Sequence, residues 1–212
     1  MPAGAEHFKP GSLRLAPNTT SSASDLVVNA GFDQQPGAQL QAYNVDIARG
    51  FRFDPRAVAG RCSVEQAHSS SCPASSRIGR GSASVNVGGQ QSTFNVDFYL
   101  TPPQRHGDIA GLVLAVHQPG SSAGFALVGR MVRLKHGPFG LELRFADAAK
   151  QLPPGATVQL NHIHARIGAR RGSHSLLTTP RRCTAKGWPF RLVVAYSTGT
   201  EKYSGPARCS QS

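Results

Sequence analysis

The sequence predicts an all-β protein folded as a two-sheet antiparallel β-sandwich, Ig-like or jelly-roll-like, with two disulfides and at most one or two short helices. Three observations predict this class: short stretches of alternating apolar and polar residues, turn residues between them, and four cysteines in two pairs. Of the 212 residues, 23 are glycine, 15 are proline and only 16% are charged, a balance typical of turn-rich β proteins. We expect residues 1–25 to form an N-terminal arm or a loose first strand, and residues 26–212 a single sandwich domain.

The first strand candidates are Asp25–Ala30 and Gln39–Ala48, which carry apolar residues at strand-like spacing. The clearest alternation follows at residues 94–101, where one apolar row consists of Phe94, Val96, Phe98 and Leu100. Such period-two alternation is the signature of a half-buried strand.

Four further strands are expected in the second half of the chain. Ile109–Val116 is apolar on both faces and should be a central strand, and Phe125–Leu134 is similar. Phe139–Ala146 and Trp188–Tyr196 alternate, with the Trp188 row predicted to face the core. Turns are indicated by Pro102-Pro103, by 136–138 and by 153–155.

Val158–Ile167 breaks this pattern, because its apolar residues change parity near Asn161-His162. A β-bulge at that point would return one face to the core. Helix signals are weak, and only Ser63–His68 and Ala146–Gln151 are expected to form one or two helical turns.

Four cysteines allow three disulfide connectivities. The local pairs, Cys62 with Cys72 and Cys183 with Cys209, are favoured because each brackets a short loop, and each bridge would contribute roughly 3 kcal/mol. The spacing fits no zinc motif. Disulfides predict an extracytoplasmic protein, secreted or at the cell surface. The N-terminus has no apolar segment typical of a signal peptide, so we expect that a signal was removed and Met1 added, rather than a cytosolic protein.

The chain has a formal net charge of +12, and residues 148–200 contain no Asp or Glu. Two arginine pairs flank the segment His174–Pro180, so they could lie at one end of the domain or simply extend into solvent. An anionic cell-envelope polymer or another surface protein is the expected partner. Specific nucleic-acid binding is not expected, and no apolar stretch is long enough for a transmembrane segment. The candidate anion-binding residues are Arg166, Arg170, Arg171, Arg181, Arg182 and Lys186.

No catalytic residue, cofactor or firm metal site is predicted. His162 and His164 are weak metal candidates, since residues two apart on a strand share a face, but the third ligand is not indicated. Gly120–Gly124 matches the G-x-S-x-G pattern of hydrolases, which requires a helix after the serine. A strand is expected there instead, so we interpret this segment as a hairpin turn.

Three segments resemble a group of uncharacterised secreted β-sandwich proteins of actinobacteria. They are Ile47-Ala-Arg-Gly-Phe-Arg-Phe-Asp-Pro55, the string Cys72-Pro-Ala-Ser-Ser-Arg-Ile-Gly-Arg-Gly-Ser-Ala83, and residues 176–190 with Cys183 and Trp188. The resemblance spans roughly residues 40–212. It implies a secreted protein with disulfides and an Ig-like sandwich, and it carries no known activity.

The predicted function is therefore a non-catalytic extracytoplasmic module of the cell envelope, with a binding or structural role, that contacts anionic polymers through its basic region. Two alternatives remain open. One is a secreted hydrolase of envelope polymers with a site built from His and Asp on loops. The other is a self-assembling surface or adhesion module that pairs exposed strand edges. The oligomeric state is not indicated by the sequence.

Overall fold

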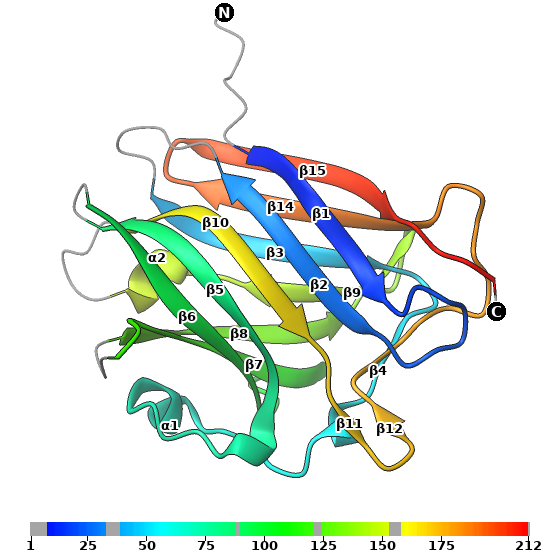
Figure 1. The fold of residues 1–212 in the computed structure, drawn as a ribbon, viewed down its shortest axis with the longest axis horizontal. Helices are drawn as coiled ribbons and strands as arrows, with labels where there is room; N and C mark the ends of the chain where they lie inside the picture. The colour runs from blue at the N-terminus through cyan, green and yellow to red at the C-terminus, as the bar shows by residue number, and fades with distance from the viewer. Residues whose placement is uncertain (1–7, 33–38, 88–89, 121–123, 153–157, 212) are drawn as a thin grey trace, which may run out of the picture.

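The computed structural model describes residues 8–32, 39–87, 90–120, 124–152 and 158–211 (Figure 1). Short elements lie between the main strands: the two-residue strands β4 (Arg52–Phe53), β11 (Arg170–Arg171), β12 (His174–Ser175) and β13 (Leu177–Thr178), two 3-10 turns (Pro55–Ala57 and Ala74–Ser76), and the helices α1 (Val64–His68) and α2 (Ala148–Gln151). The main strands are β1 (Phe8–Ala16), β2 (Asp25–Phe32), β3 (Leu40–Ala48), β5 (Arg77–Val87), β6 (Gln90–Thr101), β7 (Asp108–His117), β8 (Gly124–Arg133), β9 (Phe139–Phe145), β10 (Val158–Ile167), β14 (Trp188–Tyr196) and β15 (Gly199–Ala207).

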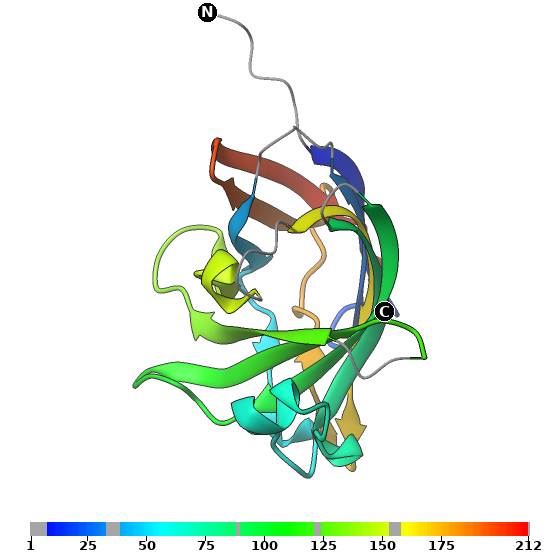
Figure 2. The ribbon, with the colours of Figure 1, turned by 90° about the vertical axis from the view of Figure 1, so that its left-hand side faces the viewer.

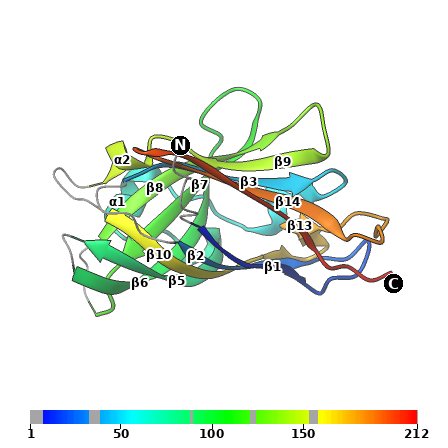
Figure 3. The ribbon, with the colours of Figure 1, turned by 90° about the horizontal axis from the view of Figure 1, so that it is seen from above.

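The predicted all-β class is confirmed, but the predicted two-sheet sandwich is wrong. The main strands form one 11-stranded antiparallel sheet in the order β1-β2-β10-β5-β6-β7-β8-β9-β3-β14-β15. This sheet curls into a nearly closed barrel, and Figure 2 shows its curved wall. Seen from above, β3, β9 and β14 lie on one side of the barrel and β1, β2 and β5 on the other (Figure 3). The two sides are not separate sheets, because β3 pairs with both β9 and β14, and β10 pairs with both β2 and β5.

The barrel closes between its first and last strands without a continuous ladder. β1 and β15 lie side by side but are not hydrogen-bonded neighbours in the sheet. Beyond the ends of these strands the chain is tied by two backbone hydrogen bonds, from Thr20 N–H to Ser210 C=O (3.2 Å) and from Ser210 N–H to Asn18 C=O (3.0 Å). We call the line between β1 and β15 the seam.

Irregular positions allow the sheet to bend, as barrel closure requires. The predicted bulge in the 158–167 strand is confirmed, because the pairing of β10 with β5 shifts register between Leu160 and His162. On β5, an added side chain at Gly79 would meet the carbonyl oxygen of Arg166 at 2.6 Å. A glycine therefore permits the close approach of β5 to β10 at the other end of this pairing, where Gly79 is opposite Ile167.

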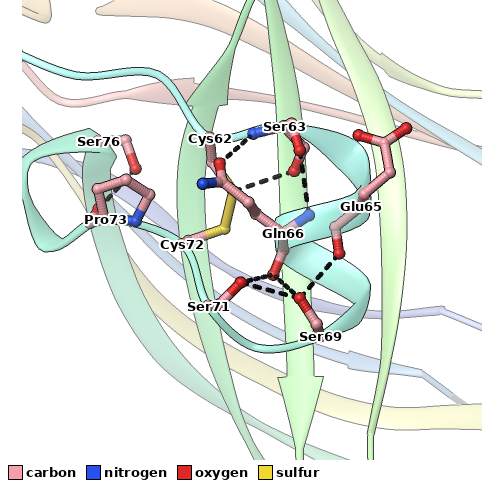
Figure 4. The surroundings of a disulfide bond; sticks show 9 residues. All are labelled: Cys62, Ser63, Glu65, Gln66, Ser69, Ser71, Cys72, Pro73 and Ser76. Carbon is pink, nitrogen blue, oxygen red and sulfur yellow. Dashed lines mark hydrogen bonds between the residues drawn. A yellow bond between two sulfur atoms is a disulfide. The ribbon is translucent and has the colours of Figure 1, made fainter.

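The first disulfide loop covers part of the outer wall. Cys62 and Cys72 are bonded as predicted, and α1 lies within their loop (Figure 4). Helix α1 begins with a capping box: Gln66 N–H donates to the Ser63 hydroxyl (3.1 Å), and Ser63 N–H donates to the Gln66 side-chain oxygen (2.9 Å). Buried Ala67 packs with outward-facing Val113 of β7. This covering explains why residues 109–116 are apolar on both faces.

The second disulfide, Cys183–Cys209, is also bonded as predicted and joins the segment before β14 to the segment after β15. Buried Trp188 lies in the same region, as expected, and its indole N–H donates to the Arg182 carbonyl (2.9 Å). Two disulfides are typical of proteins in an oxidising, extracytoplasmic environment. Among the helices of the described residues, none is long and apolar enough to cross a membrane.

Candidate functional site

The barrel core is packed at one end and hollow at the other. At the packed end, Phe51 contacts Trp188 and Phe190 edge to face, with ring centroids 5.4 and 5.6 Å apart. Toward the other end the inward rows of the strands surround a cavity of about 110 Å³. On β7, for example, Leu114 and Val116 line the cavity. The lining side chains are apolar apart from the hydroxyl of Tyr43, so the cavity is an apolar chamber.

Several inward-facing side chains keep accessible surface although they point into the barrel. Val28, Leu160, Ile163 and Leu192 all line the cavity and are only half-buried. In a filled barrel such residues would be fully packed against one another. Their partial exposure therefore places free space next to them.

Tyr43 of β3 forms part of the cavity wall. Its ring stacks on Phe145 with centroids 4.9 Å apart and an interplanar angle of 6°. Burial raises the pKa of the Tyr43 hydroxyl, so this group stays neutral and offers a hydrogen-bond donor and acceptor within an otherwise apolar wall. Helix α2 contributes Ala148 to the lining, and Leu152, which directly follows α2, also lines the cavity.

A larger groove of about 550 Å³ follows the seam. Its deeper wall includes the inward-facing side chains of Leu15 on β1 and Phe190 on β14, and its rim includes exposed polar side chains. Strand alternation explains the division, since successive residues of β1 point to opposite faces of the wall. The rim residues Ser12, Arg14, Asn29 and Arg208 are all exposed.

The groove and the cavity are adjacent. Leu13, Val28, Ala30 and Leu192 line both of them. The seam therefore gives a continuous path of lining residues from an exposed polar rim to an apolar interior. A protein site of this kind, concave and mostly apolar with a few polar groups, suits a small molecule.

The hydrolase alternative expects a site of His and Asp, and a hydrogen-bonded His–Asp pair lies at the β12 end of the molecule, besides a looser contact of 3.9 Å between His117 and Asp97. The His174 ring nitrogen Nδ1 lies 2.8 Å from Asp54 Oδ2, and the Arg56 guanidinium donates to Asp54 Oδ1 (2.9 Å). The hydrogen bond from Arg56, together with that from His174, holds the pKa of Asp54 well below its usual range. The nearby Ser175 hydroxyl donates to the Leu177 carbonyl instead of to His174 (3.0 Å). The pair is consistent with a structural contact between β12 and the turn at Pro55–Ala57.

Carboxylates also meet on the outer wall, where Asp46 of β3 is directly opposite Glu142 of β9. Each is buried and bonded to arginine: Arg191 Nε donates to Asp46 (2.6 Å) and Arg144 Nε donates to Glu142 (3.2 Å). Burial raises the pKa of Asp46, and the Arg191 hydrogen bond opposes this shift. Both carboxylates are occupied by these ion pairs; the Arg191–Asp46 pair joins β14 to β3, and the Arg144–Glu142 pair lies within β9.

His162 and His164 point out of β10 and are exposed, on the face opposite Ile163. Within the described ranges no group of three metal-ligating side chains occurs, so no third ligand joins them. The hydrolase-like segment Gly120–Gly124 includes residues 121–123, which lie outside the described residues. Its flanking strands β7 and β8 form an antiparallel pair, as the hairpin interpretation requires.

The predicted basic region is distributed over two places. Arg166 and Arg170 lie near Asp25, with Arg166 Nε donating to its carboxylate (2.8 Å). Arg171 is exposed on the β11–β12 hairpin. The rest of the set is exposed on the segment before β14: Arg181, Arg182 and Lys186. No hydrogen bond or ion pair between described residues joins the Arg170-Arg171 pair to the Arg181-Arg182 pair.

The seam is the part of the site that sequence reasoning missed. The alternation of Ser12, Leu13, Arg14 and Leu15 was a usable signal for β1, which lies within the segment interpreted as an arm or loose strand. The segment that forms β15 carries only a weak apolar row. Comparison with family models, curated proteins and solved structures finds no match to this chain.

Proposed function

We propose that this protein is a non-catalytic extracytoplasmic binding module that holds a small apolar or amphiphilic molecule inside its barrel. The apolar chamber is the observation that carries this proposal. An eight-stranded barrel is just wide enough for side chains to fill it, and the diameter grows with strand number. An 11-stranded wall therefore leaves space that the side chains of this chain do not fill.

The size and the apolar lining of the chamber support an apolar ligand. Its volume of about 110 Å³ is comparable with that of an engineered apolar cavity of about 150 Å³, which stays dry and binds benzene. A cavity of this size costs stability, about 2.6 kcal/mol at about 24 cal/mol per Å³. A bound apolar group would recover part of that free energy.

Binding of N-phenyl-1-naphthylamine tests the proposal, because this neutral dye becomes fluorescent in apolar surroundings. We expect saturable fluorescence enhancement with the wild-type protein. Val28→Phe, which places a ring in the path between groove and cavity, should reduce it at least tenfold. Val193→Phe, the same change on the outer face of β14, should leave it unchanged.

Absence of enhancement with the wild type, or equal binding by both variants, would contradict the proposal. Thermal unfolding provides a second readout that does not depend on either variant folding well. Dye at 100 times its Kd should stabilise the wild type by about 2.7 kcal/mol, which raises Tm by roughly 5–10 °C.

The exposed arginines favour a second role, contact with an anionic envelope polymer. Arg171, Arg181 and Arg182 are exposed in a stretch without acidic residues. Charge reversal at Arg170, Arg171, Arg181 and Arg182 should abolish retention on an anionic polymer column. A control that reverses the exposed residues Arg52, Arg105, Arg133 and Lys135 has the same net charge. Equal retention of the two variants at equal salt would contradict a specific role for this region.

A further inference from the structure

We infer that the seam groove binds the acidic head group of a single-chain amphiphile whose apolar chain extends into the barrel. This inference rests on the proposed function, since it assigns a ligand class to the same interior. It adds the site of the head group, the chemistry that recognises it and the route by which the chain enters.

Continuity between groove and chamber is the first support. Leu13, Val28, Ala30 and Leu192 belong to both linings, so a chain in the chamber can continue into the groove without crossing a polar layer. The groove, at about 550 Å³, is the larger of the two spaces. The chamber would hold the end of the chain, and the groove its remainder and the head group.

Charge at the rim is the second support. Arg14 on β1 and Arg208 just after β15 stand on the two sides of the seam, and both are exposed. Among the described residues that line the groove, two are arginines and none is acidic. Neither arginine has a carboxylate partner within the described part of the chain, unlike Arg166, which is paired with Asp25.

The rim also offers the hydrogen-bonding groups that an acidic head group needs. A guanidinium presents several N–H donors in a planar fork that matches a carboxylate or a phosphate. Ser12 and Asn29 add neutral polar groups at the same rim. An alkyl carboxylate and an alkyl phosphate share this chemistry, whereas a neutral alcohol or a quaternary ammonium does not.

Isothermal titration calorimetry with four ten-carbon probes distinguishes the contribution of the head group to the affinity from that of the chain. The probes are decanoate, decyl phosphate, 1-decanol and decyltrimethylammonium, each used below its aggregation concentration. We expect both acidic probes to bind about five- to tenfold more tightly than 1-decanol, since two exposed ionic contacts contribute modestly. The cationic probe should bind most weakly. The preference should shrink with added salt, because exposed charges are screened.

Paired variants assign the preference to the seam. Arg14→Gln with Arg208→Gln should remove the preference for acidic probes over 1-decanol. Arg105→Gln with Arg133→Gln removes the same charge from exposed positions outside the groove and should retain the preference. All four positions are exposed, so these variants should fold like the wild type.

The outcomes distinguish this inference from the function on which it rests. Equal wild-type affinities for decanoate and 1-decanol would overturn the inference while the apolar chamber stands. Equal loss of preference in both double variants would also overturn it, because overall charge would then be the cause. If neither the probes nor the naphthylamine dye bind, the proposed function itself fails.

Discussion

Gly129 of β8 tests how tightly the wall of the chamber is packed. It lies beneath the ring of Phe145, which is fully buried and stacks on Tyr43 on its other side. A Cβ added at Gly129 would lie 2.5 Å from Phe145 Cε1 and 2.6 Å from Cδ1. Carbon atoms in favourable contact are about 3.5–4.0 Å apart, so Gly129→Ala must displace the ring by roughly 1 Å toward Tyr43.

Two opposing effects set the size of the change. Replacing a strand glycine by alanine restricts the unfolded chain and stabilises by about 0.4–1 kcal/mol where space allows. Overpacking a well-filled site costs about 1–3 kcal/mol. The second effect should win here, because the displaced atoms belong to a rigid ring held between two strands. The net loss should be about 1–2 kcal/mol, or a fall in Tm of about 2–8 °C.

Urea unfolding of wild type, Gly129→Ala, Phe145→Leu and the double variant measures this effect. A smaller side chain at residue 145 removes the clash. The double variant should therefore lose at least about 0.5 kcal/mol less unfolding free energy than the two single variants lose together. The displaced Tyr43 ring should also weaken binding of the naphthylamine dye. An unchanged free energy of unfolding in Gly129→Ala, or strictly additive losses, would refute this reasoning.

Two other predictions concern acid stability and the second disulfide. Hydrogen bonds from Arg56 and His174 lower the pKa of Asp54, so its contribution to stability is present above its unfolded value near 4 and is lost as the pH falls below it. Because the folded pKa lies lower still, the loss is progressive, and Asp54→Asn should destabilise clearly more at pH 7 than at pH 2 in urea unfolding; an equal loss at both pH values would argue against the linkage. Replacing Cys183 and Cys209 by serine opens a loop of sequence separation 26, which should cost about 3.5 kcal/mol in thermal unfolding. A loss below about 1 kcal/mol would mean that the unfolded chain gains little freedom there.

The sequence was sufficient to identify many strands but not their arrangement. Alternation along Phe94, Val96, Phe98 and Leu100 marks a strand with one buried face, and all but Phe94 are buried in the structure. The same alternation occurs in a sandwich and in a barrel, because each has one face toward a core. What decides between them is whether β3 pairs with β9 and β10 with β2, and these long-range pairings leave no mark on the local pattern.

Local irregularities were more informative than composition. The parity change near Asn161 predicted the bulge of β10 because a strand that keeps one face buried must absorb the extra residue. The interior site was harder to predict. In the sequence, Val28 and Leu192 look like ordinary core residues. Only the width of the barrel shows that they border a cavity instead of packing against each other.

The seam also affects whether the circumference of the barrel is fixed. In a fully laddered barrel the circumference is fixed, since widening it at any point breaks a row of strand-to-strand hydrogen bonds. Here the edges of β1 and β15 can separate while every ladder remains intact, pivoting about the two hydrogen bonds that tie Asn18 and Thr20 to Ser210. The barrel is therefore an open ring held at one end, and separation of β1 from β15 would widen it without the loss of a strand ladder.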